Sequence, residues 1–97
     1  MADPSSLHLL VLDDDWRPLH RLRFDSDWRQ MIGILLHYDS RWLAIEQQRF
    51  DSHLPQWTDI QLTRRLSKRL RPIEITLADH VIRAGNSRFS FREAGRL

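Results

Sequence analysis

The sequence has no cysteine, few glycines and prolines, and no long apolar segment. Among its 97 residues there are 3 Gly, 4 Pro and no Cys. The lack of cysteine excludes disulfides, Cys-ligated zinc, iron–sulfur clusters and thiol nucleophiles, and it favours a reducing, cytoplasmic location. No segment approaches the ~20 apolar residues of a membrane-spanning helix, and the first residues lack the profile of a secretory signal. We therefore expect a soluble, untargeted protein with no membrane partner.

Length and composition are those of one globular domain. Hydrophobic residues make up 41% of the chain, which is typical of a folded rather than a disordered sequence. Fifteen basic and thirteen acidic residues give a net charge of +2, a weak bias compared with dedicated nucleic-acid binders. We expect a single domain over residues 1–97, in which residues 1–6 form a disordered tail.

Hydrophobic patterning predicts an α/β fold with five strands and two main helices. Short apolar or alternating segments predict strands at residues 7–12, 17–24, 42–45, 73–83 and 87–91. The three acidic residues 13–15 are expected to form a solvated turn between the first two strands, although they could in principle hold a hard cation. This order of elements implies a mixed central sheet covered by helices.

Two segments carry helical periodicity. The first has an apolar residue at each of positions 28, 31, 32, 35 and 36, and Ser26 or Asp27 can cap it. The second is expected to open with Thr58 and Asp59 as capping residues and to end at Pro72. Of the four tryptophans, Trp28 and Trp42 are predicted to face the core, which leaves the other two, at positions 16 and 57, as candidate interface anchors.

The second predicted helix is strongly basic. Five cations lie within eight residues: Arg64, Arg65, Lys68, Arg69 and Arg71. This surface could be a solvated helix face, or it could dock nucleic acid or an acidic protein partner. The histidines show no metal-ligand spacing, and we expect them to be structural or surface residues: His8, His20, His37, His53 and His80.

Three segments in the C-terminal half resemble the RadC family. They are Asp59-Ile60-x-Leu62-Thr63-Arg64-Arg65-Leu66, Asp79-His80-Val81-Ile82, and Ser90-Phe91-Arg92-Glu93-x-Gly95-x-Leu97. RadC proteins contain a JAB/MPN (JAMM) domain with a cytidine-deaminase-like α/β architecture. The resemblance implies the same fold for residues 7–97, and it implies functions linked to DNA repair or to mobile elements.

The same resemblance assigns the family's metal motif to four residues. That motif is His-x-His, a loop with Pro and Gly, and Ser-x-x-Asp. Counting back from Asp59, the serine position is Gln56 and the two histidine positions are Glu46 and Gln48. Asp59 keeps the aspartate ligand and Pro55 keeps the proline before the serine position, whereas both histidines are lost.

The family's general-base glutamate is also missing. It is expected near Leu22 and Arg23, where the sequence has no acid. Zinc hydrolysis needs about three protein ligands, an open position and a base, so the resemblance implies a degenerate site with no catalytic residue, metal or other cofactor. His53 is the nearest residue that could replace a lost ligand.

Three functional hypotheses follow. The first is a catalytically inactive RadC-like domain that acts as a protein-interaction or scaffold module. The second is a metal-dependent hydrolase with a rearranged site formed by Glu46, Asp59 and His53. The third is a small DNA-binding domain that uses the basic second helix.

Overall fold

The structure is a computed structural model and describes residues 6–24 and 27–97. Its elements follow in the order β1 (Ser6–Leu12), β2 (Pro18–Arg23), α1 (Trp28–His37), β3 (Trp42–Gln48), α2 (Trp57–Leu70), a 3-10 turn η1 (Arg71–Ile73), β4 (Thr76–Ala84) and β5 (Ser87–Ser90). The predicted α/β chain of five strands and two main helices is confirmed.

The five strands form one mixed sheet in the order β2-β1-β3-β4-β5. Strands β3 and β4 run parallel, because α2 carries the chain back across the sheet between them, and the other neighbouring pairs are antiparallel. Strand β3 is therefore central, and the positions of the sequence motif lie on this strand and on the segment that leaves it.

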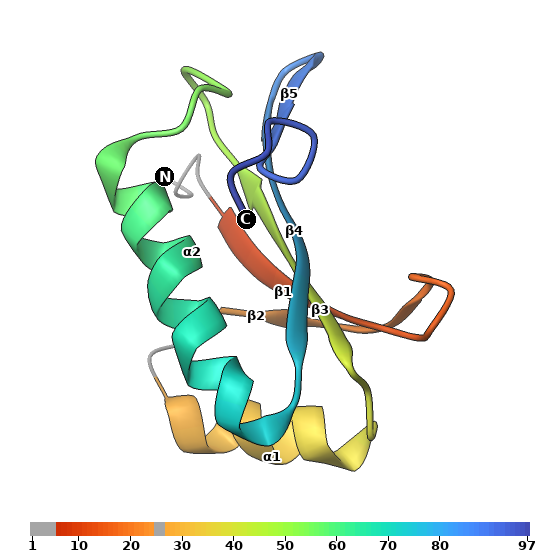
Figure 1. Ribbon diagram of the computed structural model, residues 1–97. Coiled ribbons are helices and arrows are strands. Elements are labelled where there is room, and N and C mark those ends of the chain that lie inside the picture. The colour runs from red at the N-terminus through yellow and green to blue at the C-terminus, as the bar shows by residue number, and fades with distance from the viewer. Residues whose placement is uncertain (1–5, 25–26) are drawn as a thin grey trace.

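Both helices pack on one face of the sheet (Figure 1). Alternate residues of the strands meet one buried stripe from each helix, as the helical and strand periods require. This core includes Leu9, Val11, Leu43 and Ile45 from β1 and β3, Met31 and Leu35 from α1, and Leu66 and Leu70 from α2. The prediction that helices cover the sheet therefore holds for this face.

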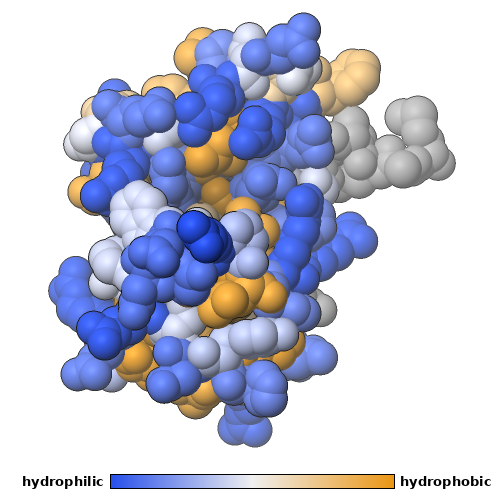
Figure 2. All heavy atoms as spheres, turned by 90° about the vertical axis from the view of Figure 1, so that its right-hand side faces the viewer, coloured by the Kyte–Doolittle hydropathy of each residue, from blue (hydrophilic) through white to orange (hydrophobic). Residues whose placement is uncertain are grey.

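The opposite face carries a smaller apolar cluster and no helix of the described part of the chain. Leu12, Ala44 and Ala78 form it, with Leu10 and Trp42 packed against them. Trp16 lies edge-on to Trp42 with ring centroids 5.4 Å apart, and the Arg92 guanidinium carbon lies 4.5 Å from the Trp16 ring centroid. Figure 2 shows hydrophobic side chains in separate areas between hydrophilic ones on the right-hand side of Figure 1.

In the N-terminal half, the predicted cap Asp27 is confirmed, and the predictions for Ser6 and Leu36 need correction. Ser6, predicted to be part of a disordered tail, is the first residue of β1, and residues 1–5 lie outside the described residues. Asp27 is the N-cap of α1 and its Oδ1 accepts from the Gln30 amide at 3.3 Å, whereas the alternative cap, Ser26, lies outside the described residues. Leu36, predicted on the buried stripe of α1, is 57% exposed.

Three further boundaries differ from the predictions. Strand β3 continues to Gln48, because its last three residues still pair with both β1 and β4. Helix α2 is capped by Gln56 and not by Thr58, since Asp59 is already its third residue. Strand β4 begins at Thr76, because the 3-10 turn and the left-handed φ of 59° at Glu74 delay extended backbone.

Hydrogen bonds to the half-buried carboxylate of Asp79 hold the C-terminal segment against β4. Asp79 accepts from the Ser90 hydroxyl at 2.6 Å and from the Arg92 amide at 3.1 Å, and the Ser90 oxygen in turn accepts from the Glu93 amide at 3.1 Å. This network gives a structural reason for the Asp79-His80 and Ser90-Phe91-Arg92-Glu93 segments. Neither helix of the described residues has the length and apolar character needed to cross a membrane.

Candidate functional site: the retained aspartate and its surroundings

Asp59, which the resemblance assigns to the aspartate position of the motif, is buried at the start of α2. Its side chain is only 4% exposed. Oδ1 accepts from Nη2 of Arg49, with which Asp59 forms a salt bridge, and Oδ2 accepts from the Gln56 amide at 2.6 Å. Both carboxylate oxygens are therefore engaged by donors of this chain.

Burial and hydrogen bonding act in opposite directions on this carboxyl group. Burial alone would raise the pKa of Asp59, but the hydrogen bonds from Arg49 and the Gln56 amide, together with the Arg49 charge, outweigh it and lower that pKa. Asp59 is therefore held as an anion whose charge is neutralised by a neighbouring arginine.

Arg49 is the residue that the sequence reasoning missed. It directly follows β3, and its backbone amide donates to the Arg83 carbonyl at 2.8 Å, which extends the pairing with β4 by one residue. Its side chain is 9% exposed, and Nη1 donates to the Leu54 carbonyl at 3.0 Å. One guanidinium thus joins the end of β3, the loop and the start of α2. Nothing in the spacing of the motif marks this position.

Glu46, the other carboxylate of the motif, lies on the opposite face of the sheet. Its neighbours Ile45 and Gln47 face the helices, so the alternation of a strand turns Glu46 away from them. Its Oε1 lies 3.2 Å from Nη2 of Arg21, which also approaches Nδ1 of His8 at 3.4 Å. The structure therefore does not bring Glu46 and Asp59 together.

The remaining motif positions contribute no ligand set. Gln48 is exposed at the end of β3, and Gln56 is exposed and uses its backbone to begin α2. His53 lies half-buried in the loop between β3 and α2. Within residues 6–24 and 27–97, no three or more His, Cys, Asp or Glu side chains gather in a way that could hold a metal ion.

A zinc ion does not fit the residues around Asp59. Zinc requires three or four convergent donors, and here both oxygens of Asp59 are used and the nearest side chain is a cation. A divalent ion would have to displace the Arg49 guanidinium or lie beside it, at a large electrostatic cost. At the position expected for the general base, Leu22 packs against the core and Arg23 is exposed.

A buried polar layer next to Asp59 has a structural role. The His80 side chain is completely buried, with Nδ1 2.6 Å from the Thr63 hydroxyl and Nε2 3.0 Å from Oε1 of Gln47. Its ring stacks on Phe91 with centroids 4.4 Å apart. Burial lowers the pKa of His80 from 6.5 to about 4, although the charges of Asp59 and Asp79 oppose this shift. His80 is therefore neutral at physiological pH.

The basic residues of α2 and η1 do not form one surface. All five are exposed, and no salt bridge to any of them occurs among the described residues. Arg65 and Arg69 border a groove between α1 and α2. The other three border a second hollow, together with Arg96 from the C-terminal segment: Arg64, Lys68 and Arg71.

The predicted anchor Trp57 is 61% exposed, and it has exposed apolar neighbours. In the loop before it, Phe50 is 83% exposed and Leu54 is 58% exposed. The other predicted anchor, Trp16, is 38% exposed, whereas Trp28 and Trp42 are half-buried against the two apolar clusters.

Comparison with known protein families gives a match in the C-terminal half of the chain. Residues 51–96 match the family model of the RadC-like JAB domain. The matched range begins after Arg49 and includes Asp59, all of α2 and the network around Asp79. No curated protein matches the chain. The resemblance seen in the C-terminal half of the sequence is therefore confirmed.

Proposed function

We propose that this RadC-like JAB domain is catalytically inactive and acts as a protein-interaction or scaffold module. The observation that carries the proposal is the buried ion pair between Arg49 and Asp59. The one retained metal-ligand position is bound internally by a cation of the same chain. The family resemblance adds that the module would serve a DNA-repair or mobile-element function.

The surroundings of Asp59 support the loss of hydrolysis. A zinc-activated water needs three protein ligands to lower its pKa and a base to remove its proton. Here Glu46 is paired with Arg21 on the other face of the sheet, and the base position holds Leu22 and Arg23. The alternative hydrolase would need Glu46, Asp59 and His53 to converge, which requires both ion pairs to break.

The exposed loop supports a binding role. Large apolar side chains that remain in water are commoner on interaction surfaces than elsewhere, and Phe50, Leu54 and Trp57 lie within eight residues of the chain. The loop between β3 and α2, which carries part of the metal motif in the family, thus presents exposed apolar side chains that a protein partner could contact.

Zinc titration by calorimetry tests the proposal. We expect no sub-micromolar binding to the chain and the same null result for Asp59→Asn, which keeps an oxygen at that position but removes its charge. Sub-micromolar binding that Asp59→Asn abolishes would overturn the proposal. So would turnover of a peptide or phosphodiester that stops when a chelator is added.

A second candidate function, binding of DNA, is favoured by the hollow between α2 and the C-terminal segment. It is lined by four cations that have no salt bridge among the described residues: Arg64, Lys68, Arg71 and Arg96. If their phosphate contacts carry binding, affinity should fall by about the 0.9 power of salt concentration per contact on duplex DNA. Fluorescence anisotropy of a labelled duplex measures this slope, and Arg64→Glu with Lys68→Glu should abolish binding. Absent or salt-independent binding would eliminate this candidate.

A further inference from the structure

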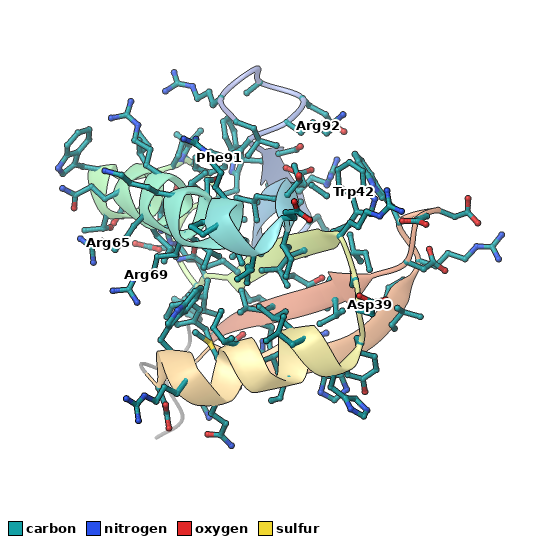
Figure 3. The ribbon with its side chains drawn as sticks, turned by 60° about the horizontal axis from the view of Figure 1, so that its bottom comes forward. Asp39, Trp42, Arg65, Arg69, Phe91 and Arg92 are labelled. Atoms are coloured by element: carbon teal, nitrogen blue, oxygen red, sulfur yellow. The ribbon has the colours of Figure 1, made fainter. Side chains whose placement is uncertain are left out.

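The groove between α1 and α2 combines an apolar floor with a basic rim. Its floor and walls are five apolar side chains: Phe24, Trp28, Met31, Leu62 and Leu66. Arg65 and Arg69 stand at its edge, on successive turns of α2, and Figure 3 shows both side chains extending from the same side of that helix. Met31 and Leu66 are almost fully buried, so they form the bottom of the groove.

The size of the groove limits its occupant. Its volume of about 230 Å³ is smaller than the roughly 300–1,000 Å³ of pockets that enclose drug-sized ligands or cofactors. A groove of this size accepts one apolar side chain of a larger partner, in the way that an anchor residue fills a pocket at a protein interface. The groove is therefore better suited to a protein segment than to a free small molecule.

The positive charges of Arg65 and Arg69 favour a bound segment that is acidic. No carboxylate of the described residues forms a salt bridge with Arg65 or Arg69. The Arg69 guanidinium carbon lies 5.2 Å from the centroid of the Trp28 ring, which is within the range of a cation–π contact. The N–H edges of a guanidinium held in this way can still donate to a carboxylate in a bidentate pair.

We propose that this groove binds an acidic amphipathic segment of a partner protein, with an apolar anchor on its floor and carboxylates on Arg65 and Arg69. A nucleic acid would meet the two cations but would leave the aliphatic floor without a matching group, and the hollow on the other side of α2 has the more polar, more basic lining that phosphates require. The inference rests on the proposed binding role and names the partner's chemistry.

The four tryptophans allow the occupied surface to be identified. Trp28 borders the groove, Trp57 lies beside the exposed loop, and Trp16 and Trp42 lie on the face of the sheet without helices. In a spectrum of the ¹⁵N-labelled chain, each indole N–H gives its own signal, which single Trp→Phe variants assign. A titration in the presence of a chelator keeps this test independent of the zinc experiment.

The probe is a short synthetic helical peptide with leucines on one face and glutamates beside them. We expect it to move the Trp28 indole signal and to leave those of Trp16 and Trp42 in place. One matched peptide has serine for each leucine and another has lysine for each glutamate, and neither should bind. Arg65→Glu with Arg69→Glu should weaken binding at least tenfold, which corresponds to about 1.4 kcal/mol, because two charge-assisted contacts become repulsive.

The control variant is Arg64→Glu with Lys68→Glu, which makes the same change in charge on the other side of α2. It should change the affinity by less than about threefold, because Arg64 and Lys68 do not border the groove and act on the peptide only through charges screened by salt. Three results would overturn the proposal. They are no movement of the Trp28 signal, equal weakening by both double variants, and movement of that signal on dilution of the protein alone, which would show that a second copy of the chain fills the groove.

Discussion

At the scale of single residues, the buried ion pair between Arg49 and Asp59 occupies the position that the resemblance assigns to a metal ligand. Asp59 keeps its place at the start of α2 and its negative charge, but the balancing positive charge belongs to Arg49. Breaking a buried pair by removing one partner is costly, because the other charge remains buried without compensation. The stability of the domain should therefore depend on Arg49.

Arg49→Met should lower the free energy of unfolding by roughly 3–5 kcal/mol, since it leaves the buried Asp59 carboxylate unpaired. Urea unfolding followed by circular dichroism measures this loss. In the double variant with Asp59→Asn, no uncompensated charge remains, so part of the stability should return. As a control, Arg88→Met breaks the exposed pair with Glu93 and should cost less than about 1 kcal/mol. A double variant less stable than Arg49→Met would contradict the account.

The lowered pKa of the buried His80 should make the stability of the fold depend on pH. Its pKa is about 4 in the folded chain and 6.5 when unperturbed, so between these values the unfolded state binds the proton more tightly. The contribution of His80 to the free energy of unfolding should be fully present above about pH 6.5. As the pH drops to 4, the free energy of unfolding should fall by up to roughly 3 kcal/mol.

Urea midpoints measured across this pH range test the assignment to His80. His80→Gln should flatten the profile between pH 6.5 and 4, whereas the same change at the exposed His37 should leave it intact. If the two variants gave the same profile, the acid sensitivity would belong to another group.

At the scale of elements, the periodicity of hydrophobic residues predicted the helices and strands. It did not predict where they end, because contacts between elements determine the ends. The last residues of β3 are Glu46, Gln47 and Gln48, and this polar sequence gave no reason to extend the strand. The strand continues because Arg21 pairs with Glu46, and His80 with Gln47, from other elements. Such partners are distant in sequence, so a local pattern cannot reveal them.

For the candidate site, too, the sequence predicted individual positions but not the contacts between distant residues. The family resemblance predicted that Asp59 takes the aspartate position of the motif and that Glu46 and Gln48 take its two histidine positions. It did not identify Arg49, because the pairing depends on how the loop from residue 49 to residue 56 returns the chain to the end of β3. The two faces of β3 also separate Glu46 from Asp59, and only the pairing register shows this.

Substitution of the two serines of β5 should have different effects on the free energy of unfolding. Ser90 is buried and its hydroxyl links Asp79 to the Glu93 amide, whereas Ser87 is exposed. Ser90→Ala should cost about 1–3 kcal/mol, because the half-buried Asp79 carboxylate loses a charge-assisted hydrogen bond from a buried donor. Ser87→Ala should change stability by less than about 0.5 kcal/mol. Equal unfolding midpoints in urea would show that the network around Asp79 does not fasten the segment.

At the scale of the whole molecule, the sheet order predicts where the fold opens first. Strand β3 has a neighbour on each side and a helical layer on one face, while β2 and β5 are the edges of the sheet. Local opening is easiest where few buried contacts are lost. Hydrogen exchange should therefore be slowest at Leu43 and Ile45 and faster throughout β5. Exchange at the same rate in β3 and β5 would contradict this order.

The central claim concerns the charge that balances Asp59. A crystal structure of the chain grown with excess zinc, with diffraction data collected at the zinc absorption edge, tests it most directly. The account predicts no anomalous peak within bonding distance of Asp59 and an Arg49 guanidinium that still donates to its carboxylate. A zinc peak on Asp59, with Arg49 displaced, would contradict it.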